Sequence, residues 1–483
     1  MITLCQPYRI DRSLLRKWFV FIALAKCLWF VAFVALRSED WASNATIGGI
    51  AFYPNESYSY YLPIENLLAH GQYTSVCRMP GLLPFYAPLR FFLSEIAAKQ
   101  CMVILQVILD VFATLSLGLL VARIFQSIKA LHITLLISCI SSFTAVRNNF
   151  LLSDSLCISI SVLSIYSFSS FLINPRFKNL LLTALGLCTA VFLRPALIVV
   201  LPVISVLLVA HLGLSRRSIG WCAVLILPTV CALSLWTLHN RITDGRAIVF
   251  VAPLGECQPQ ITPDFAAIRK WIIATGGDYQ PWAKGGESYW FFDSSEFRPM
   301  PFQADDFATA YDSTLLLTLK SDYHLLHSGS LSNSDSLQLE KSIINRAQTC
   351  YDSYVAEHPY KFFVFNRLKF LQMILFPHRI DDLPFPAYHE MNWIQKIIKM
   401  GSLAAIPFIS FISVIATLFW IAKRKWRYVL WMAIPMGLVC AHAAIGFVEQ
   451  RYLATSYPFL VMLIAGFFLD LRKNALMDVV SMR

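Results

Sequence analysis

CMVILQVILDVFATLSLGLLVA, residues 101–122, is an apolar stretch in which Asp110 is the only charged residue. A helix of this length spans about 30 Å, the thickness of the hydrocarbon core of a bilayer. Similar stretches recur, and the predicted spans are roughly 18–36, 101–122, 131–147, 151–173, 179–193, 195–211, 219–239, 403–422, 428–447 and 453–470. The sequence predicts an all-α polytopic membrane protein with about 10–13 transmembrane helices.

The composition of the whole chain supports this class. Of 483 residues, 57% are hydrophobic and 14% are charged, which is about half the charged fraction of an average soluble protein. The net charge of +11 comes from short basic clusters between the apolar stretches, the pattern of cytoplasmic loops, so we expect no nucleic-acid partner. The clusters are Arg9, Arg12, Arg16 and Lys17; Arg176 and Lys178; Arg216 and Arg217; Lys423, Arg424, Lys425 and Arg427; Arg472 and Lys473.

The predicted topology places both termini in the cytoplasm, because all basic clusters then fall on one side. The first span is predicted to stay uncleaved, since Arg37 stands where a signal peptide would carry small residues. The apolar segment 81–98 contains Pro84, Pro88 and Glu95. It is therefore predicted to form a re-entrant or interfacial helix pair rather than a crossing.

Three parts of the chain follow from this topology. Residues 1–239 form a transmembrane module, with a first extracytoplasmic loop at 37–80 and interfacial helices within 57–98. Residues 240–400, with 18 of the 29 acidic residues, are predicted to fold as a mixed α/β or α-rich extracytoplasmic domain, and 401–483 supply the C-terminal transmembrane helices. The tryptophans of the region 240–400 are assigned to core packing or to stacking on sugars. They are Trp271, Trp282, Trp290 and Trp393. A disulfide between two of Cys77, Cys257 and Cys350 is compatible with their external positions, and the sequence does not choose the pair.

The segment YPNESYSYYLPIENLLAHGQY, residues 53–73, predicts a short amphipathic helix at the membrane surface. Ser57 or Ser59 would cap its start, Pro63 would lie in the first turn, and Gly71 would end it. Glu56 would then lie just before the helix N-terminus. The helix dipole there favours its ionised form, which can act as a base.

Charged residues next to apolar spans are few, and five of them fall on the predicted external side: Glu56, Arg78, Asp154, Arg194 and Arg451. Taken singly, each is also explained as a solvated charge, a snorkelling arginine or a membrane anchor. Together they predict a site for an anionic group, because the planar guanidinium of arginine suits phosphate.

Inside the spans, we expect Asp110 to hydrogen-bond to Gln106 or Thr114 within the bundle. Lys26 is expected either to snorkel or to pair with an intramembrane acid. The sequence contains no convincing metal-ligand cluster, nucleotide-binding loop or nucleophile elbow.

Five short motifs, in this order, resemble the membrane glycosyltransferase superfamily of the C-fold (GT-C). The resemblance is strongest to its polyprenyl-phosphate-sugar-dependent branch, which includes protein O-mannosyltransferases and the lipid A aminoarabinose transferase. Glu56 stands where that family more often has aspartate, and His239 where it usually has arginine. The motifs are NESYSYYLPIENLLAHGQYTSVCRMPGLLPFY (55–86), LLSDSL (151–156), LGLCTAVFLRP (185–195), LWTLHNRITDGRAIVF (235–250) and EQRYLATSYPFL (449–460).

The resemblance implies inverting transfer of a sugar from a polyprenyl-phosphate donor to an acceptor hydroxyl on a glycolipid, a polysaccharide or a protein. It implies Glu56 as catalytic base with Asp154 assisting, and a donor phosphate bound by Arg78, Arg451, Arg194, Tyr60 and Tyr452. Some relatives use a divalent cation, such as Mg²⁺ or Mn²⁺, and others do not. The compact cytoplasmic loops and the lack of retention signals favour a bacterial inner membrane, with the active site facing the periplasm, over the endoplasmic reticulum.

Two other classes are weighed against this one. A lipid-linked glycan polymerase or ligase would carry its main external loop late in the chain and lack the early acidic loop. A lipid or sugar flippase or transporter would show internal repeats and small external loops. The long external region and the early acidic segment favour the transferase.

Overall fold

The structure is a computed structural model. It describes residues 2–38, 46–47, 50–52, 57–73, 77–251, 262–277, 286–293, 299–377, 383–445 and 450–481. The described residues are mostly helical, and one antiparallel pair of short strands, β1 (Thr46–Ile47) and β2 (Ala51–Phe52), lies in the first loop. The chain divides into two compact units, of which the first comprises Met1–Val251, Leu375–Ala441 and Gln450–Arg483, and the second Ala252–Ile374 and His442–Glu449.

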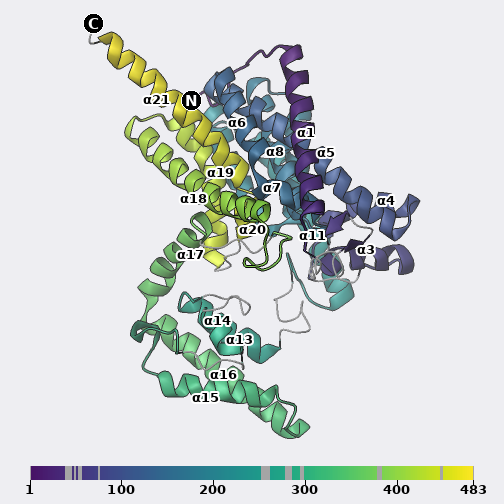
Figure 1. The fold of residues 1–483 in the computed structure, drawn as a ribbon, viewed down its shortest axis with the longest axis vertical. Coiled ribbons are helices and arrows are strands. Elements are labelled where there is room, and N and C mark those ends of the chain that lie inside the picture. Colours follow the sequence, from purple (N-terminus) through teal and green to yellow (C-terminus); the bar gives the residue numbers. More distant parts are fainter. Residues whose placement is uncertain are drawn as a thin grey trace. The chain divides into compact units, whose positions relative to one another are not determined.

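The first unit is a bundle of long helices (Figure 1). Its α-helices are α1 (Arg12–Ala35), α3 (Tyr58–His70), α4 (Leu83–Phe92), α5 (Glu95–Phe125), α6 (Ile128–Ile140), α7 (Ser142–Ala145), α8 (Asp154–Ile173), α9 (Phe177–Leu193), α10 (Val200–Leu212), α11 (Arg216–Asp244), α18 (Trp393–Ala422), α19 (Trp426–Ile445), α20 (Gln450–Leu453) and α21 (Tyr457–Ser481). Three short 3-10 helices join them: η2 (Pro80–Leu82), η3 (Val146–Asn149) and η4 (Pro195–Val199). Helix α5 packs against α1, α6 and α8, and α8 packs in turn against α9.

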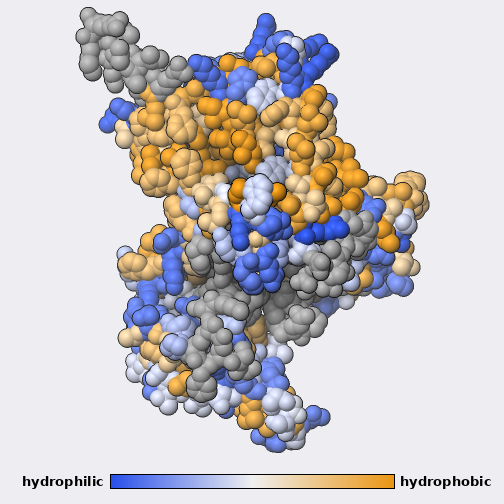
Figure 2. Space-filling model, viewed as in Figure 1, coloured by the Kyte–Doolittle hydropathy of each residue, from blue (hydrophilic) through white to orange (hydrophobic). Residues whose placement is uncertain are grey.

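The helices of the bundle have the length and apolar composition of membrane spans. Among the described residues, seven helices are long and apolar enough to cross a membrane, and α6 with the bent segment Ser142–Asn149 makes an eighth if the pair counts as one span. The predicted spans 179–193 and 453–470 correspond to shorter apolar helices. Figure 2 shows a broad hydrophobic surface over the helices of this unit. The chain is an integral membrane protein.

Three predicted boundaries are wrong for local reasons. The segment 81–98 is not a self-contained helix pair, because Ser94 caps a new helix by accepting from the Ala97 amide, so that Glu95 already begins α5. Helix α18 starts at Trp393 rather than near 403, because Asn392 and Gln395 form a capping box. Pro63 lies inside α3 and not in its first turn.

Helix α3 otherwise confirms the amphipathic helix predicted after the first span. Gly71 ends it in the left-handed region at φ 74°, where glycine carries no steric penalty. The cap predicted at Ser57 is wrong, because its buried hydroxyl makes no capping hydrogen bond. Tyr60, Tyr61 and Ile64 are buried on one face, whereas Leu68 is exposed.

Contacts between segments distant in sequence show which helix ends lie together at each end of the bundle. At the end that carries the basic clusters, Gln126 donates to the Gln6 carbonyl (3.0 Å) and Arg427 donates to the Ile124 carbonyl. At the other end, Gln395 donates to the Leu36 carbonyl (2.7 Å). We call this second end the acidic-loop end. It is the end at which α1 leads through Leu36 into the first loop, residues 37–80, which contains Glu56.

The second unit is α-rich in its described residues. Its helices are α13 (Pro263–Ala274), α14 (Glu287–Phe292), η5 (Ala304–Asp306), α15 (Ser313–Leu326), α16 (Asn333–Glu357), the π-helix η6 (Lys361–Phe365) and α17 (Asn366–Leu375), whose last residue belongs to the first unit. Trp271 and Trp290 belong to its hydrophobic core, so the packing role predicted for them is confirmed. Trp393 instead begins α18 and is 70% exposed, and Trp282 lies outside the described residues.

Candidate functional site

Asp154 and Arg194 form a buried ion pair at the acidic-loop end of the bundle. Asp154 is the first residue of α8 and is 1% exposed, and its Oδ1 atom accepts from Nη2 of Arg194. Arg194 ends α9 in an extended conformation, which the following Pro195 favours. Because α8 and α9 pack as antiparallel neighbours joined by a short turn, the start of one lies beside the end of the other.

Further cations surround this pair. Arg451 on α20 and Arg147 on η3 both act electrostatically on the Asp154 carboxylate, as Arg194 does. The Tyr452 ring lies between two of them, with its centroid 5.4 Å from Arg194 Cζ and 5.8 Å from Arg451 Cζ. Three guanidinium groups from separate parts of the chain therefore gather at one carboxylate.

The first loop reaches the same place through Tyr60 and Arg78. Arg78 donates from Nε to Ser59 Oγ (2.9 Å), and its Cζ atom lies 4.4 Å from the centroid of the Tyr60 ring. Tyr60 in turn interacts electrostatically with Arg194. The residue Cys77, next to Arg78, is disulfide-bonded, whereas Cys350 is free and Cys257 lies outside the described residues.

Gly81 explains how the loop comes so near to α9. A Cβ atom on this glycine would lie 2.3 Å from the carbonyl carbon of Phe192 and 2.4 Å from the Leu193 nitrogen. The backbone after Arg78 is therefore in direct contact with the backbone just before Arg194. Only glycine permits this approach.

The structure thus brings together six of the seven residues assigned to the site from sequence: Asp154, Arg194, Arg451, Arg78, Tyr60 and Tyr452. The seventh, Glu56, lies outside the described residues. Sequence reasoning missed Arg147, which is 2% exposed. Its signal was the run Arg147-Asn148-Asn149 between two apolar stretches, since polar side chains at membrane depth are costly and usually have a task.

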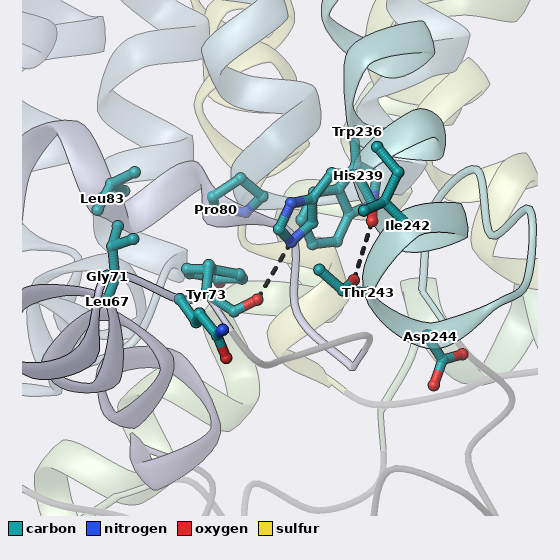
Figure 3. A pocket seen from close by; sticks show the side chains of 11 residues that line it. Leu67, Gly71, Tyr73, Pro80, Leu83, Trp236, His239, Ile242, Thr243 and Asp244 are labelled. Carbon is teal, nitrogen blue, oxygen red and sulfur yellow. Dashed lines mark hydrogen bonds between the residues drawn. The ribbon is translucent and has the colours of Figure 1, made fainter.

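A pocket of about 780 Å³ adjoins this cluster (Figure 3). The Tyr73 ring packs edge-on against Trp236 (5.8 Å between centroids), and Trp236 stacks on His239 (5.4 Å). His239 donates to the Tyr73 carbonyl (3.1 Å). The lining is mostly apolar and comes from both sides of the cleft: Leu67, Gly71, Gln72, Tyr73, Pro80, Leu83, Trp236, His239, Ile242, Thr243 and Asp244.

Tyr73 connects the pocket to the cationic cluster. Its hydroxyl donates to the Arg78 carbonyl (3.1 Å). Burial raises the pKa of the Tyr73 phenol, so that the hydroxyl stays protonated and keeps this bond. Tyr73 therefore lines the pocket and also bonds to the backbone of a residue of the cluster.

Glu65, the second glutamate of α3, has a structural role. It pairs with Arg90 (3.0 Å) and accepts from the Tyr86 hydroxyl (2.7 Å), which holds α3 against α4. Within the described part of the chain, no group of three or more His, Cys, Asp or Glu residues is placed to hold a metal ion.

Comparison with known proteins finds a distant likeness in structure. No model of a protein family matches the chain, and no curated protein matches it significantly. The structure is similar to the archaeal oligosaccharyltransferase AglB from Archaeoglobus fulgidus, solved in complex with an inhibitory peptide and a dolichol-phosphate, with a TM-score of 0.44 and 12% sequence identity. The similarity covers 97% of this chain and 52% of that one, so that the chain spans about half the length of AglB.

Proposed function

We propose that this protein is an inverting glycosyltransferase that moves a sugar from a polyprenyl-phosphate donor to an acceptor hydroxyl at the extracytoplasmic face of the membrane. The observation that carries the proposal is the buried ion pair of Asp154 and Arg194, with the Tyr452 ring in contact with both Arg194 and Arg451. A buried cationic cluster beside a carboxylate suits a reaction in which a phosphate leaves while a hydroxyl loses its proton.

The carboxylates deal with the acceptor in this proposal. The acceptor oxygen attacks the anomeric carbon, the bond from that carbon to the phosphate oxygen breaks, and a carboxylate takes the hydroxyl proton. Glu56 is the base implied by the resemblance. Asp154 can position the acceptor, because its buried Oδ2 atom accepts no hydrogen bond from the part of the chain that the structure describes.

The arginines deal with the leaving group. Arg78, Arg194 and Arg451 can donate charge-assisted hydrogen bonds to the phosphate oxygens as negative charge develops on them, and Tyr60 and Tyr452 can donate from their hydroxyls. A Mg²⁺ or Mn²⁺ ion could neutralise the same charge, but the arginine cluster favours neutralisation by side chains.

The pocket beside Tyr73 suits the lipid part of the donor. Its volume lies within the range of roughly 300–1,000 Å³ usual for small-ligand sites, and Leu67, Leu83 and Ile242 give it an apolar wall. We propose that it holds the first isoprene units, which places the phosphate next to Arg78. The acceptor is a glycolipid, a polysaccharide or a protein, and residues 240–400 form the extracytoplasmic domain that selects it.

The orientation follows from charge. The basic clusters lie at the helix ends opposite the site, and basic residues are retained on the cytoplasmic side. Both termini are therefore placed in the cytoplasm. In a bacterial inner membrane, the site would face the periplasm.

The test is release of polyprenyl phosphate from a panel of polyprenyl-phosphate sugars by the purified protein in nanodiscs, with membrane extract of the native host as acceptor source. We expect sugar-dependent release by the wild type and at least a hundredfold loss in Glu56→Gln while donor binding persists. Equal turnover by wild type and Glu56→Gln would exclude Glu56 as the base. Absence of release with every donor would contradict the proposed function.

A second arm tests the phosphate site. Arg78→Gln should raise the KM for the donor about tenfold or more, since a hydrogen bond to a charged group contributes roughly 1.5–3 kcal/mol. Arg90→Gln is the matched control, because this nearby arginine pairs with Glu65 outside the cluster. Equal KM changes in both variants would exclude a direct role for Arg78.

A further inference from the structure

A buried polar network of four residues adjoins the site in the chain but contains none of the residues assigned to the site. Lys26 on α1 is 1% exposed and pairs with Asp110 on α5, with 2.9 Å between Nζ and Oδ2. The same Oδ2 atom accepts from Asn148 Nδ2 (2.8 Å), and Asn148 Oδ1 accepts from Ser155 Oγ (2.5 Å). The network thus runs from α1 through α5 to η3 and α8.

Two members of the network are next to site residues in the chain. Asn148 follows Arg147, and Ser155 follows Asp154. The Asp110 carboxylate therefore holds the segment that carries an arginine of the cluster. Through Asn148 it also holds the residue after the central carboxylate.

The held segment needs this support because it is not a regular helix. The chain bends by 57° between α6 and the segment Ser142–Asn149, and irregular backbone at membrane depth requires partners within the protein. Gln106, also on α5, donates to the carbonyls of Asn148 and Phe150 (3.0 Å each). Side chains of α5 therefore satisfy both the backbone and the side chain of this segment.

We propose that Asp110 is a positioning residue for the transferase site, which acts by accepting from Asn148 and so fixes Arg147 and Asp154 in register with each other. Lys26 balances the charge that this acceptor brings into the bundle, since an unpaired buried carboxylate is costly. The inference deepens the proposed function and rests on it for its kinetic readout.

The essential feature is the oxygen on residue 110 that accepts from Asn148, and not the ion pair with Lys26. Two double variants separate the two. Lys26→Met with Asp110→Asn removes both charges and keeps an amide oxygen for Asn148, whereas Lys26→Met with Asp110→Leu removes both charges and the acceptor. Neither variant leaves an unpaired buried charge, and replacement of a buried ion pair by apolar residues is often tolerated.

We expect Lys26→Met/Asp110→Asn to keep its rate of sugar transfer within threefold of the wild type. Lys26→Met/Asp110→Leu should lose at least tenfold in kcat at similar thermal stability, and its amide hydrogen exchange over residues 147–155 should be faster than in the wild type. Equal rates and equal exchange in the two double variants would overturn the proposal, as would a loss of rate in both that follows a loss of thermal stability.

Arg123→Met is the control for general loosening of the bundle. Arg123 on α5 donates to Ser169, Ser170 and Tyr166 on α8, at the far end of the same helix pair. This variant should lower thermal stability without lowering kcat, and a comparable loss of kcat would also overturn the proposal. If the wild type transfers no sugar from any donor, the proposed function fails, and the exchange contrast between the two double variants still decides the positioning.

Discussion

The carboxylate of Asp154 accepts from Arg194 through Oδ1, while its Oδ2 atom accepts no hydrogen bond from the described part of the chain. The Oδ1 atom thus holds α8 to the end of α9, and the Oδ2 atom can accept a hydrogen bond from a ligand. This division links the stability of the α8–α9 pair to the chemistry of the site.

Single and double substitutions at this pair should therefore separate folding from function. Arg194→Met should lower the free energy of unfolding by about 1–3 kcal/mol, because it removes the donor to Asp154 Oδ1 while Arg147 and Arg451 still act on the carboxylate. Adding Asp154→Leu should not restore stability, because it takes the counter-charge from Arg147 and Arg451, and it should leave the enzyme inactive. Thermal unfolding in detergent and sugar transfer in nanodiscs measure the two effects, and a double variant more stable than Arg194→Met would contradict the argument.

The contact between Gly81 and the end of α9 predicts a strong effect from a small change. Gly81→Ala would place a Cβ atom 2.3 Å from the Phe192 carbonyl carbon, and backbone cannot yield as a side chain can. Separation of Arg78 from Arg194 should follow, with a loss of about 1–3 kcal/mol in stability and at least a tenfold loss in transfer rate.

Gly220→Ala is the matched control for this glycine, because nothing lies within 4 Å of a Cβ atom built there. It should leave the rate unchanged and raise stability by about 0.5–1 kcal/mol, because alanine replaces glycine within α11. If Gly81→Ala behaves like Gly220→Ala, the close approach is not needed for the site.

The fold was largely predictable because a helix that lies in a bilayer must be a long apolar stretch, which the sequence shows directly. Apolar length marks the helices, and Gly71 marks the C-terminal end of α3. What failed was local: Pro63 lies within α3, and Ser94 starts α5 six residues before the predicted span. Single capping bonds and single prolines decide such boundaries, and they are too weak to stand out in a chain dominated by apolar stretches.

The candidate site was predictable only as a set. No single motif places Asp154 next to Arg451, and the order of the motifs supplied the grouping. Arg147 was missed because its place depends on the bend after α6, which no pattern marks. Lys26 was expected either to snorkel or to pair with an acid, and packing of α1 on α5 selects Asp110 as its partner. The expected hydrogen bond between Asp110 and Thr114 is present (3.2 Å), while Gln106 bonds elsewhere.

The proposed lipid pocket can be tested by filling it. Leu67 lines the pocket, whereas its neighbour Leu68 is 43% exposed and does not. Leu67→Trp should therefore raise the KM for polyprenyl-phosphate donors about tenfold or more, and Leu68→Trp should leave it unchanged. The effect of Leu67→Trp should shrink for donors with shortened isoprenoid chains, and a KM increase independent of chain length would assign the pocket to another ligand.

His324 predicts how the second unit responds to acid. Burial lowers the pKa of its imidazole, with Lys320 and His327 adding to the effect, while its hydrogen bond to the Phe291 carbonyl opposes it. A folded-state pKa below the unfolded value of about 6.5 means that the unfolded chain binds the proton more readily. The contribution of His324 to stability is therefore complete above about pH 6.5 and declines as the pH falls towards the folded-state pKa.

His324→Gln removes this titration and keeps a side-chain donor for the Phe291 carbonyl. Between pH 7.5 and 5.5, amide exchange over 286–293 and 313–326, corrected for intrinsic rates, should therefore lose more protection in the wild type than in the variant. Because Asp293 and His327 surround the same position, the comparison is the difference between the two proteins at each pH and not the absolute slope. If wild type and variant lose protection equally, another group controls the acid response, and if the variant loses more, the sign of the linkage is reversed.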